Sequence, residues 1–569
     1  MHLQKSKSRG RAYLSIVQSY REKDTGKSKA RTIKSLGYLD VLEKQYIDPI
    51  AHFKAVVEKM NQEEAAKNIP ISIRINKTEI LDKNIRNRKN IGYAALSKIY
   101  HELGLHVFMN NRARSFGAEY SPNSIMKLLV YSRILYPGSK KKTHENREMF
   151  FEDTNFSLDD VYRSLTFFNK LRDDIQKHLH RKITEYYERS TDLVYYDVTN
   201  YYFEIDEQDE LRKKGISKEH RPDPIIQMGL FMDTMGIPIS YGLFPGNTND
   251  CETLVPLMAK MKRDYNIGRT IVVADKGLNT SNNIVFNTLR HDGYVYSQTV
   301  RGGNKELKIF VLDENGYAWQ GDDYKIKSRS YPRTINVKTA TGQTKKVPID
   351  EKQVIFYSRA YDKKAKADRE AAIIKARDLV KNPAKYTRAT SYGAARFVKN
   401  LSFDKKTGEV ITVGQAPFFD EAKLCEEEKY DGYYAIVTSE YKKSDSEIID
   451  IYRGLWKIEE SFKVTKSDLE TRPVYLSREE HIQAHFLLCF ISLVIARCLE
   501  IRLGNRFSIT RIAESLRQSA CSHVQDNYYL LDHYDDVTDA IGEAFGIHIN
   551  KKFLSLGEIK NILGASKEA

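Results

Sequence analysis

The stretch LVYYDVT, residues 193–199, is where the chain changes from helical to strand periodicity. It is a short apolar run of strand-forming residues and carries one charged side chain, Asp197. The elements predicted after it are, in order, the strands 225–233 and 237–246 around the short turn TMG, a helix over 250–265, the strand 270–275, a second helix and the strand 294–300. This order predicts a mixed α/β sheet that begins with an antiparallel meander.

The segments before this sheet are first basic and then helical. RAYLSIVQSYRE and KARTIKSLGYL flank the turn KDTGK, which predicts a β-hairpin over residues 1–40. Residues 1–34 carry ten lysines and arginines against two acidic residues, a net charge of +8. That excess suits contacts with phosphates, and it equally fits a solvated terminus. From 41 to 190, apolar residues recur at three- and four-residue steps and predict helices.

Residues 301–440, which follow the sheet, alternate short strand candidates at 306–313, 352–361 and 431–439 with polar turns and helical segments such as 368–380. They are interpreted as a mainly β insertion. Trp319 lies beside a run of cations that contains no acidic residue from 325 to 346. The first cations of that run are Lys325, Lys327 and Arg329. Cations mixed with aromatic rings suit a nucleic-acid face, because the charges meet phosphates and the rings stack on bases. An edge strand protected by lysines is the alternative.

Composition and charge exclude several classes of protein. The 569 residues carry 91 lysines and arginines against 76 aspartates and glutamates, a net charge of +15 that points to a polyanionic partner. With 41% hydrophobic residues, the chain is too apolar to be intrinsically disordered. Its longest strongly apolar run, 486–496, has about half the length of a membrane span. Five cysteines without CxxC spacing fit a reducing cytoplasm rather than a disulfide framework.

Three carboxylates stand where chemistry is expected. Asp197 and Asp275 each end, or nearly end, a run of apolar strand residues, and groups at the carboxyl ends of strands in an open α/β sheet face the functional crevice. Glu459 lies on a predicted helix over 446–466, and Tyr452 and Lys466 lie seven residues to either side of it. This spacing places all three on one largely apolar, inward face. Each acid taken alone also fits a turn residue or a core ion pair.

In combination, two strand aspartates and one helix glutamate form the oxygen ligand set that Mg²⁺ prefers. Such sets hold two ions about 3.5–4 Å apart, which activate an attacking water or 3′-hydroxyl and stabilise the leaving oxygen of a phosphoryl transfer. We therefore predict that Asp197, Asp275 and Glu459 bind two Mg²⁺ ions, for which Mn²⁺ substitutes. Lys466 is placed to neutralise a neighbouring phosphate.

The segment YRGLWKIEESFKVTK, residues 452–466, resembles a signature of the DDE transposases of bacterial insertion sequences, in the branch marked by tyrosine, arginine, glutamate and lysine. The signature residues found at the family spacing are Tyr452, Glu459 and Lys466. Leu455 occupies the arginine position, and Arg453 lies two residues before it. The segments YYDVTNYYFE around Asp197 and VVADKGLN around Asp275 resemble the first and second aspartate motifs of the same family.

The resemblance covers most of the chain and implies an RNase H-like catalytic core. The order of domains that it implies is a basic hairpin (1–40), a helical DNA-binding region (41–190), the first part of the core (191–300), the β-rich insertion (301–440), the second part of the core with the catalytic helix (441–475) and a C-terminal helical region (476–569). The 184 positions between Asp275 and Glu459 suit the insertion, because members of this branch interrupt the core there.

The function implied by the resemblance is cut-and-paste DNA transposition. The enzyme cleaves double-stranded DNA at transposon ends and joins the ends to a target by two-metal phosphoryl transfer. Tyr452, Arg453 and Lys466 are expected to contact DNA near the cut. A homodimer assembled on DNA is expected in the bacterial cytoplasm, associated with the nucleoid, with no membrane and no small-molecule substrate. Trp319 is a candidate for stacking on a flipped base if the DNA passes through a hairpin.

Two other functions fit the same residues. A nuclease on the same fold would cut DNA without joining it to a target. A domesticated DNA-binding protein would have lost catalysis, which the three acids argue against and Leu455 at the arginine position leaves open.

Overall fold

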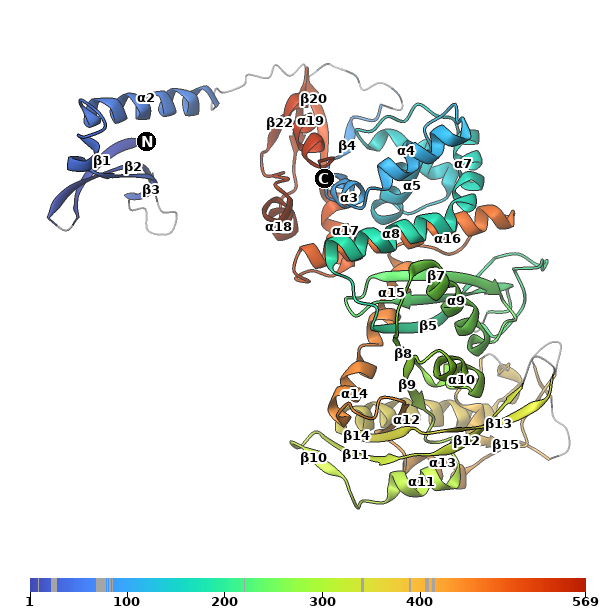
Figure 1. Ribbon diagram of the computed structural model, residues 1–569. Coiled ribbons are helices and arrows are strands. Elements are labelled where there is room, and N and C mark those ends of the chain that lie inside the picture. The colour runs from blue at the N-terminus through green and yellow to red at the C-terminus, as the bar shows by residue number, and fades with distance from the viewer. Residues whose placement is uncertain are drawn as a thin grey trace. The chain divides into compact units, whose positions relative to one another are not determined.

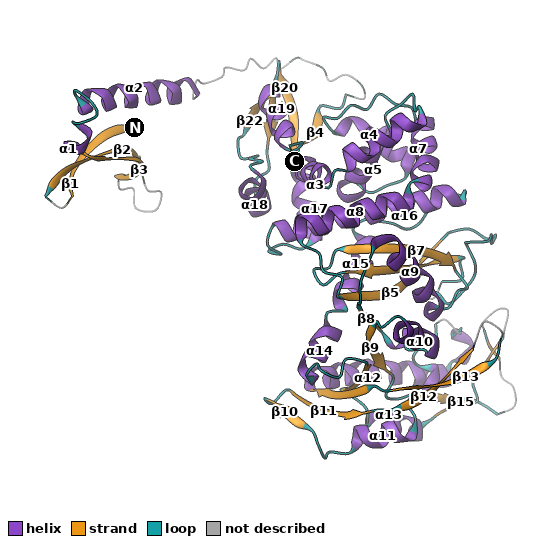
Figure 2. Cartoon of the chain, in the orientation of Figure 1, coloured by secondary structure: helices purple, strands orange, loops and turns teal. Residues whose placement is uncertain are grey.

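The computed structural model describes the chain apart from residues 9, 22–27, 68–77, 79, 81–82, 84, 220, 339–341, 388–389, 405–408, 412–414 and 569. The chain divides into two compact units, Met1–Ile85 and Arg86–Ala569. Each unit has its own sheet and helices, which Figure 1 labels and Figure 2 colours by type.

The first unit is a three-stranded antiparallel sheet with two helices. The strands are β1 (His2–Ser8), β2 (Arg11–Arg21) and β3 (Ser28–Tyr38), in the order β1-β2-β3, followed by α1 (Leu39–Leu42) and α2 (Pro49–Lys67). The pairing of β2 with β3 corresponds to the predicted hairpin, and β1 adds a strand that the pattern did not indicate. Leu14, Ile16 and Val17 on β2 are buried. The predicted turn at 23–27 lies outside the described residues.

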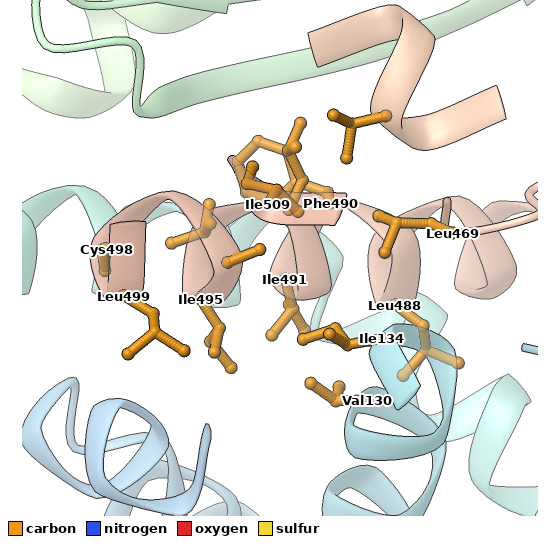
Figure 3. Close-up of a cluster of buried hydrophobic side chains, with 14 of the residues drawn as sticks. Val130, Ile134, Leu469, Leu488, Phe490, Ile491, Ile495, Cys498, Leu499 and Ile509 are labelled. Atoms are coloured by element: carbon orange, nitrogen blue, oxygen red, sulfur yellow. The ribbon is translucent and has the colours of Figure 1, made fainter. Parts of the chain in front are cut away.

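The second unit contains a helical layer built around one long apolar helix. The helices of this layer are α3 (Tyr93–Glu102), α4 (Leu105–Phe116), α5 (Pro122–Leu135), α6 (Lys140–Glu145), α7 (Leu158–Lys170), α8 (Arg172–Tyr187), α16 (Glu479–Arg502) and α17 (Ile509–Gln518). α16 packs against α3, α5 and α7, and Figure 3 shows its apolar side chains meeting Val130 and Ile134 of α5. By length and composition α16 passes as a membrane span, but 94% of its apolar window is buried inside the protein.

A nine-stranded mixed sheet forms the centre of the second unit. Its order is β10 (Ala318–Gln320), β11 (Tyr324–Ser330), β14 (Lys352–Ser358), β19 (Tyr433–Thr438), β9 (Gly293–Gln298), β8 (Ile271–Ala274), β5 (Leu193–Tyr202), β6 (Ile225–Met232) and β7 (Pro238–Pro245). The strands β5, β6 and β7 form the antiparallel meander that the sequence predicts, and β8 and β9 extend it in parallel.

Alternation along the strands assigns side chains to the two faces of this sheet. On β5, Val194, Tyr196 and Val198 face a core shared with α9 (Asp250–Tyr265) and α10 (Ser281–Leu289). Tyr195 and Tyr201 face the opposite core, where α16 lies. Two shorter helices, α14 (Asp445–Arg453) and α15 (Trp456–Ser467), cover part of this second face, α14 packing on β8 and β9 and α15 on β5.

The segment 301–440 differs from the mainly β insertion that its pattern suggested. Its strands β10, β11, β14 and β19 continue the central sheet, with β19 paired to β9. It also contains the helices α11 (Lys305–Leu312), α12 (Arg359–Lys381) and α13 (Glu421–Glu428). The strand candidates at 352–361 and 431–439 correspond to β14 and β19, and the expected helical segment at 368–380 lies in α12, but the strand candidate at 306–313 is the helix α11. The hydrogen bonds that join the strands to the core sheet are tertiary contacts with no local signal.

The C-terminal region, expected to be helical, also contains strands. The sheet β22-β21-β20-β4 comprises β4 (Arg88–Asn90), β20 (Ala520–Gln525), β21 (Tyr528–Leu531) and β22 (Phe553–Ser555), beside α18 (Asp536–Phe545) and α19 (Leu556–Ala565). β4 comes from the start of the unit, so this sheet ties the two ends of residues 86–569 together.

Candidate active site

Asp197 and Asp275 lie next to each other on the central sheet. β5 and β8 run parallel with Tyr196 opposite Ala274, so the next residue on each strand is an aspartate. Both positions continue the alternation that points Tyr195 and Val273 toward the face covered by α14 and α15. The two carboxylates predicted to share a site are therefore brought to one place by strand register.

The charge of the Asp197 carboxylate is disfavoured in the folded protein. Burial, together with the neighbouring carboxylates of Asp275 and Asp250, raises the pKa of Asp197 to about 6, although the Lys218 ammonium and the hydrogen bond from the Val198 amide oppose the shift. One Asp197 oxygen accepts a hydrogen bond from the Val198 amide at 2.7 Å. A buried acid beside two other acids is a group that a cation would stabilise.

Asp275 is held by two hydroxyl groups. Its Oδ1 accepts hydrogen bonds from Ser297 Oγ at 2.7 Å and from the Tyr452 hydroxyl at 3.3 Å. Burial, followed by the charge of Asp275, raises the pKa of Tyr452, so the phenol stays protonated and remains a donor. The first signature residue of the helix thus contacts the second aspartate directly.

The predicted single helix over 446–466 is divided into α14 and α15 at Gly454 and Leu455. A Cβ atom at Gly454 would lie 1.9 Å from the Tyr195 hydroxyl of β5, so only glycine permits this close approach of helix and sheet. Leu455, at the arginine position of the signature, is buried in the core.

Glu459 lies on the first turn of α15 and is exposed, which corrects the predicted inward, apolar environment. Ile458 and Phe462 occupy the buried side of this helix. In the described part of the chain, no hydrogen-bond or ion-pair partner is found for the Glu459 carboxylate. Its neighbour Glu460 pairs with Arg497 at 2.9 Å.

Lys466, seven residues after Glu459, reaches back toward the aspartates. Its Nζ donates to Glu219 Oε1 at 3.2 Å and lies 5.5 Å from the centre of the Tyr201 ring. Burial and then the charge of Lys218 lower the pKa of Lys466 to about 8, against the opposing charge of Asp197. Two lysines and the aspartate pair therefore share one electrostatic environment.

The predicted cage of three carboxylates is only partly assembled. Among the described residues, no group of three or more histidine, cysteine, aspartate or glutamate side chains lies close enough together to hold a metal ion. Two of the three predicted ligands are adjacent, and a divalent cation would favour the charged form of Asp197 that burial and the neighbouring acids disfavour. The aspartate pair therefore fits a hard cation, with Glu459 on the helix that covers the same sheet face.

Three residues of this environment were not predicted from the sequence. Lys218 lies between β5 and β6, and its Nζ pairs with Asp250 at 3.6 Å and donates to the carbonyl of Val198. Asp250 begins α9, and Ser297 lies on β9 beside Asp275. In the sequence, Lys218 is an ordinary loop charge and Asp250 an ordinary charge at a helix start, so neither could be assigned to the site in advance. Ser297 could have been assigned to it, because its place beside Asp275 follows from the strand order.

The first cations of the basic run that was predicted to contact DNA already interact with other groups of the protein. Lys325 and Lys327 are 5% and 4% exposed. Lys325 pairs with Glu314 at 2.5 Å, and Arg329 pairs with Glu306 at 3.0 Å. These side chains already have partners, so we do not retain them as DNA contacts.

Trp319 and Arg453 remain accessible. Trp319 is 50% exposed and lies on β10 at the edge of the sheet. Arg453 is exposed, pairs with Asp450 at 3.3 Å, and lies 5.4 Å from the centre of the Tyr324 ring. Both stay candidates for contacts with DNA.

Comparison with known proteins identifies two family models in the chain. Residues 3–69 match the IS1634 family transposase N-terminal domain, and residues 203–495 match the transposase DDE domain. No curated protein matches the sequence. Among solved structures, the chain is similar to the piggyBac transposase synaptic complex with hairpin DNA, with 8% identity, a TM-score of 0.33, and coverage of 85% of this chain and 86% of that chain. Because the DDE model spans more than half of the sequence, the chain belongs to the DDE transposases of insertion sequences.

Proposed function

We propose that this transposase cleaves DNA at transposon ends and joins the ends to a target, with Asp197, Asp275 and Glu459 as its metal ligands. The observation that carries the proposal is the register of β5 and β8, which sets two aspartates side by side beneath the helix of the signature. The strand order β7-β6-β5-β8-β9, an antiparallel meander extended in parallel, is typical of an RNase H-like core and supports the same assignment.

Asp197 and Asp275 would hold divalent ions, Mg²⁺ or Mn²⁺, through their carboxylates. When bound, such ions lower the pKa of an attacking water or 3′-hydroxyl and stabilise the leaving oxygen of an in-line displacement. Tyr452 and Ser297 fix the rotamer of Asp275 through their hydrogen bonds, so the ligand is oriented before substrate arrives.

Glu459 would complete the ligand set when DNA and metal bind. Its carboxylate is exposed and has no partner among the described residues, so it loses no ion pair when it turns toward the aspartates. Lys466 would neutralise a phosphate beside the scissile bond, exchanging the carboxylate of Glu219 for that of the substrate. Arg453, exposed on the preceding helix, would contact the same strand farther away.

The partner would be double-stranded DNA bound by two copies of the chain, because transposition holds two DNA ends at once. The excess of cations over acids supports a polyanionic substrate. We place the reaction in the bacterial cytoplasm, at the nucleoid.

The test is incubation of pre-cleaved transposon ends and Mg²⁺ with a supercoiled plasmid. We expect products in which the end is joined to the plasmid, and we expect Asp197→Asn to lower their rate by about a thousandfold or more, since several kcal/mol of charge stabilisation are lost. Nicked plasmid without joined product would favour a nuclease. A folded wild-type protein that binds the pre-cleaved ends but neither joins them to the plasmid nor nicks it would favour the domesticated DNA-binding protein.

A further inference from the structure

A cavity of about 490 Å³, with Arg472 in its wall, lies in the second unit. It is lined by the end of α5, the start of α6, α16 and the segment that follows α15. None of its lining residues belongs to the proposed metal site. The volume exceeds that of a phosphate group and lies within the range of sites that bind small molecules or nucleotides.

Two cations are buried in the wall of this cavity. Arg133 and Lys140 are each 5% exposed. Arg133 donates only to backbone carbonyls, those of Leu469, Glu470 and Gly138, at 3.0–3.3 Å. The Nζ of Lys140 lies 3.2 Å from His485 Nδ1, which is a neutral partner.

No described carboxylate pairs with either cation. Glu470 lines the cavity but forms no ion pair with Arg133 or Lys140 in the part of the chain that the structure describes. The Nε of Arg133 is buried without a hydrogen-bond partner. A buried cation without a counter-charge costs several kcal/mol, so two of them side by side are the mark of a site whose anion comes from outside.

The pKa shifts of Lys140 and His485 agree with a cavity that lacks an anion beside its cations. Burial and the charge of Arg133 lower the pKa of Lys140 to about 7. Burial and the charges of Lys140 and Arg133 keep the pKa of His485 well below its usual value. An anion in the cavity would reverse the first shift, so Lys140 would take up a proton when the anion binds near pH 7.

The rim of the cavity suits a nucleic acid rather than a free ion. Lys141 and Tyr475 line it from the outside, and the Tyr475 side chain is 72% exposed. A cation beside an accessible aromatic ring meets both parts of a nucleotide, since the charge contacts the phosphate and the ring packs on the base or sugar.

The cavity is also connected to the proposed active site. Glu219 pairs with Arg472, which lines the cavity, through Oε2, and it accepts from Lys466 through Oε1. A phosphate bound beside Arg472 would compete with Glu219 for the guanidinium and leave that carboxylate to Lys466.

We propose that this cavity binds a backbone phosphate of the DNA that the transposase holds, with Arg133, Lys140 and Lys141 as its cations. The assignment of the phosphate to DNA rests on the proposed function, whereas the anion site itself rests on the two unpaired buried cations. The bound nucleotide lies outside the scissile position, so it anchors the DNA without taking part in the chemistry.

The test compares two neighbouring lysines of one triplet. Lys141 lines the cavity, whereas Lys142 is exposed beside it and does not. The affinity for a fluorescein-labelled DNA duplex is measured by anisotropy, without divalent ions, over a range of salt concentrations. We expect Lys141→Gln to reduce the slope of log Kd against log salt by about one and Lys142→Gln to leave it near the wild-type value. Equal slopes for the two variants would overturn the assignment to DNA.

A second arm uses inorganic phosphate and the buried lysine. Phosphate is expected to raise the melting temperature of the wild type more than that of Lys140→Met, whose side chain keeps the volume and loses the charge. No difference between the two would overturn the anion site. Stabilisation by phosphate together with equal DNA slopes for the two triplet variants would assign the cavity to free phosphate instead of DNA.

Both arms are independent of cleavage, so the two proposals can fail separately. A protein that binds DNA through Lys141 but never cleaves it would contradict the proposed function alone. A protein that cleaves normally and whose Lys141→Gln variant binds DNA like Lys142→Gln would contradict only the cavity.

Discussion

Asp197 on β5 and Asp233 at the end of the neighbouring strand β6 have opposite electrostatic environments. Asp233, directly after β6, is fully buried and accepts from Arg189 Nε at 2.7 Å and from the Ile237 amide at 2.9 Å. Asp197 on β5 faces Asp275 and Asp250, with Lys218 as its main compensation. One aspartate has its counter-ion built into the protein, and the other is crowded by further acids.

The difference separates a structural acid from an acid kept for a ligand. The Arg189 guanidinium also donates to the carbonyls of Ile237 and Pro238, so the Asp233 pair fixes the turn between β6 and β7. No such network closes around Asp197, whose folded environment favours the protonated form at the expense of stability. A fold retains such a destabilised pair where a bound cation provides the missing charge.

The largest expected contrast is between the effects on stability of replacing Asp233 and Asp197 by asparagine. Asp233→Asn should lower the free energy of unfolding by about 3–5 kcal/mol, because it leaves Arg189 buried without a counter-charge. Asp197→Asn should raise the melting temperature without divalent ions. The folded pKa of about 6 lies above the unfolded value, so wild-type stability falls as pH rises from about 4 to 6, and the asparagine removes that loss.

Urea unfolding in EDTA, repeated between pH 4 and pH 7, measures the free energy of unfolding of both variants, and thermal unfolding under the same conditions measures their melting temperatures. Parallel curves against pH between 4 and 7 for wild type and Asp197→Asn would contradict the raised pKa. A destabilised Asp197→Asn would mean that this carboxylate is structural, like Asp233.

Divalent ions should stabilise the wild type and distinguish two adjacent glutamates. At a hundredfold excess of Mg²⁺ over its Kd, we expect about 2.7 kcal/mol of added stability, and Glu459→Gln should lose part of it. Glu460→Gln is the matched control, because Glu460 pairs with Arg497 and is not in the proposed ligand set. The melting temperatures of the wild type and both variants are measured across a Mg²⁺ titration. An equal dependence on Mg²⁺ in Glu459→Gln and Glu460→Gln would remove Glu459 from the site.

Lys466 should give DNA binding a characteristic pH dependence. Its pKa of about 8 means that the free side chain carries its charge below pH 8 and loses it above, so affinity for DNA should weaken through that range. Lys466→Gln should cost about tenfold in affinity, the scale of one charged hydrogen bond to phosphate. Lys463→Gln, exposed on the same helix, should leave both the affinity and the pH profile nearly unchanged.

Anisotropy titrations between pH 7 and pH 9 make this comparison directly. Lys466→Arg should bind DNA with a flat profile, because a guanidinium stays charged throughout. If the DNA affinity of Lys466→Arg still falls between pH 7 and pH 9, the titrating group is not Lys466.

The smallest expected effect distinguishes a structural lysine from one that contacts DNA. Lys325 lies within 5.5 Å of the ring centres of Tyr317, Trp319, Tyr357 and Tyr433. Lys325→Met should therefore lower the free energy of unfolding by about 1 kcal/mol with little change in DNA affinity. Lys345→Met, on an exposed position of β13 (Thr344–Ile349), should not change stability. Weaker DNA binding by Lys325→Met at unchanged stability would restore the sequence-based prediction for this run.

The sequence was sufficient where the signal is local or depends on strand order. Apolar runs and turns located β5 to β9 in order, and that order places the residues after two parallel strands at one edge of a sheet. Asp197 and Asp275 could therefore be paired in advance. The spacing of Tyr452 and Lys466 likewise predicted that both side chains face the site. In the structure, Tyr452 donates to Asp275, and Lys466 feels the charge of Asp197.

Periodicity alone failed where a single tertiary contact decides the geometry. Gly454 lies too close to the Tyr195 hydroxyl for a Cβ atom, which is a contact between segments far apart in the chain, and Glu459 five residues later is exposed. The cation run failed for a similar reason, because the carboxylates and rings that enclose Lys325 come from other elements.

The sequence by itself determined the α/β order of the core, the family, and the acids on which the chemistry is proposed to depend, because hydrophobic periodicity and motif spacing are properties of the chain. Only the tertiary structure decided which charges are compensated. Arg189 and Arg133 are both single arginines in the sequence. In the fold, Arg189 pairs with Asp233, whereas Arg133 is buried with Lys140. The energy of a buried charge depends on what surrounds it within a few ångströms, and those neighbours are brought together only by folding.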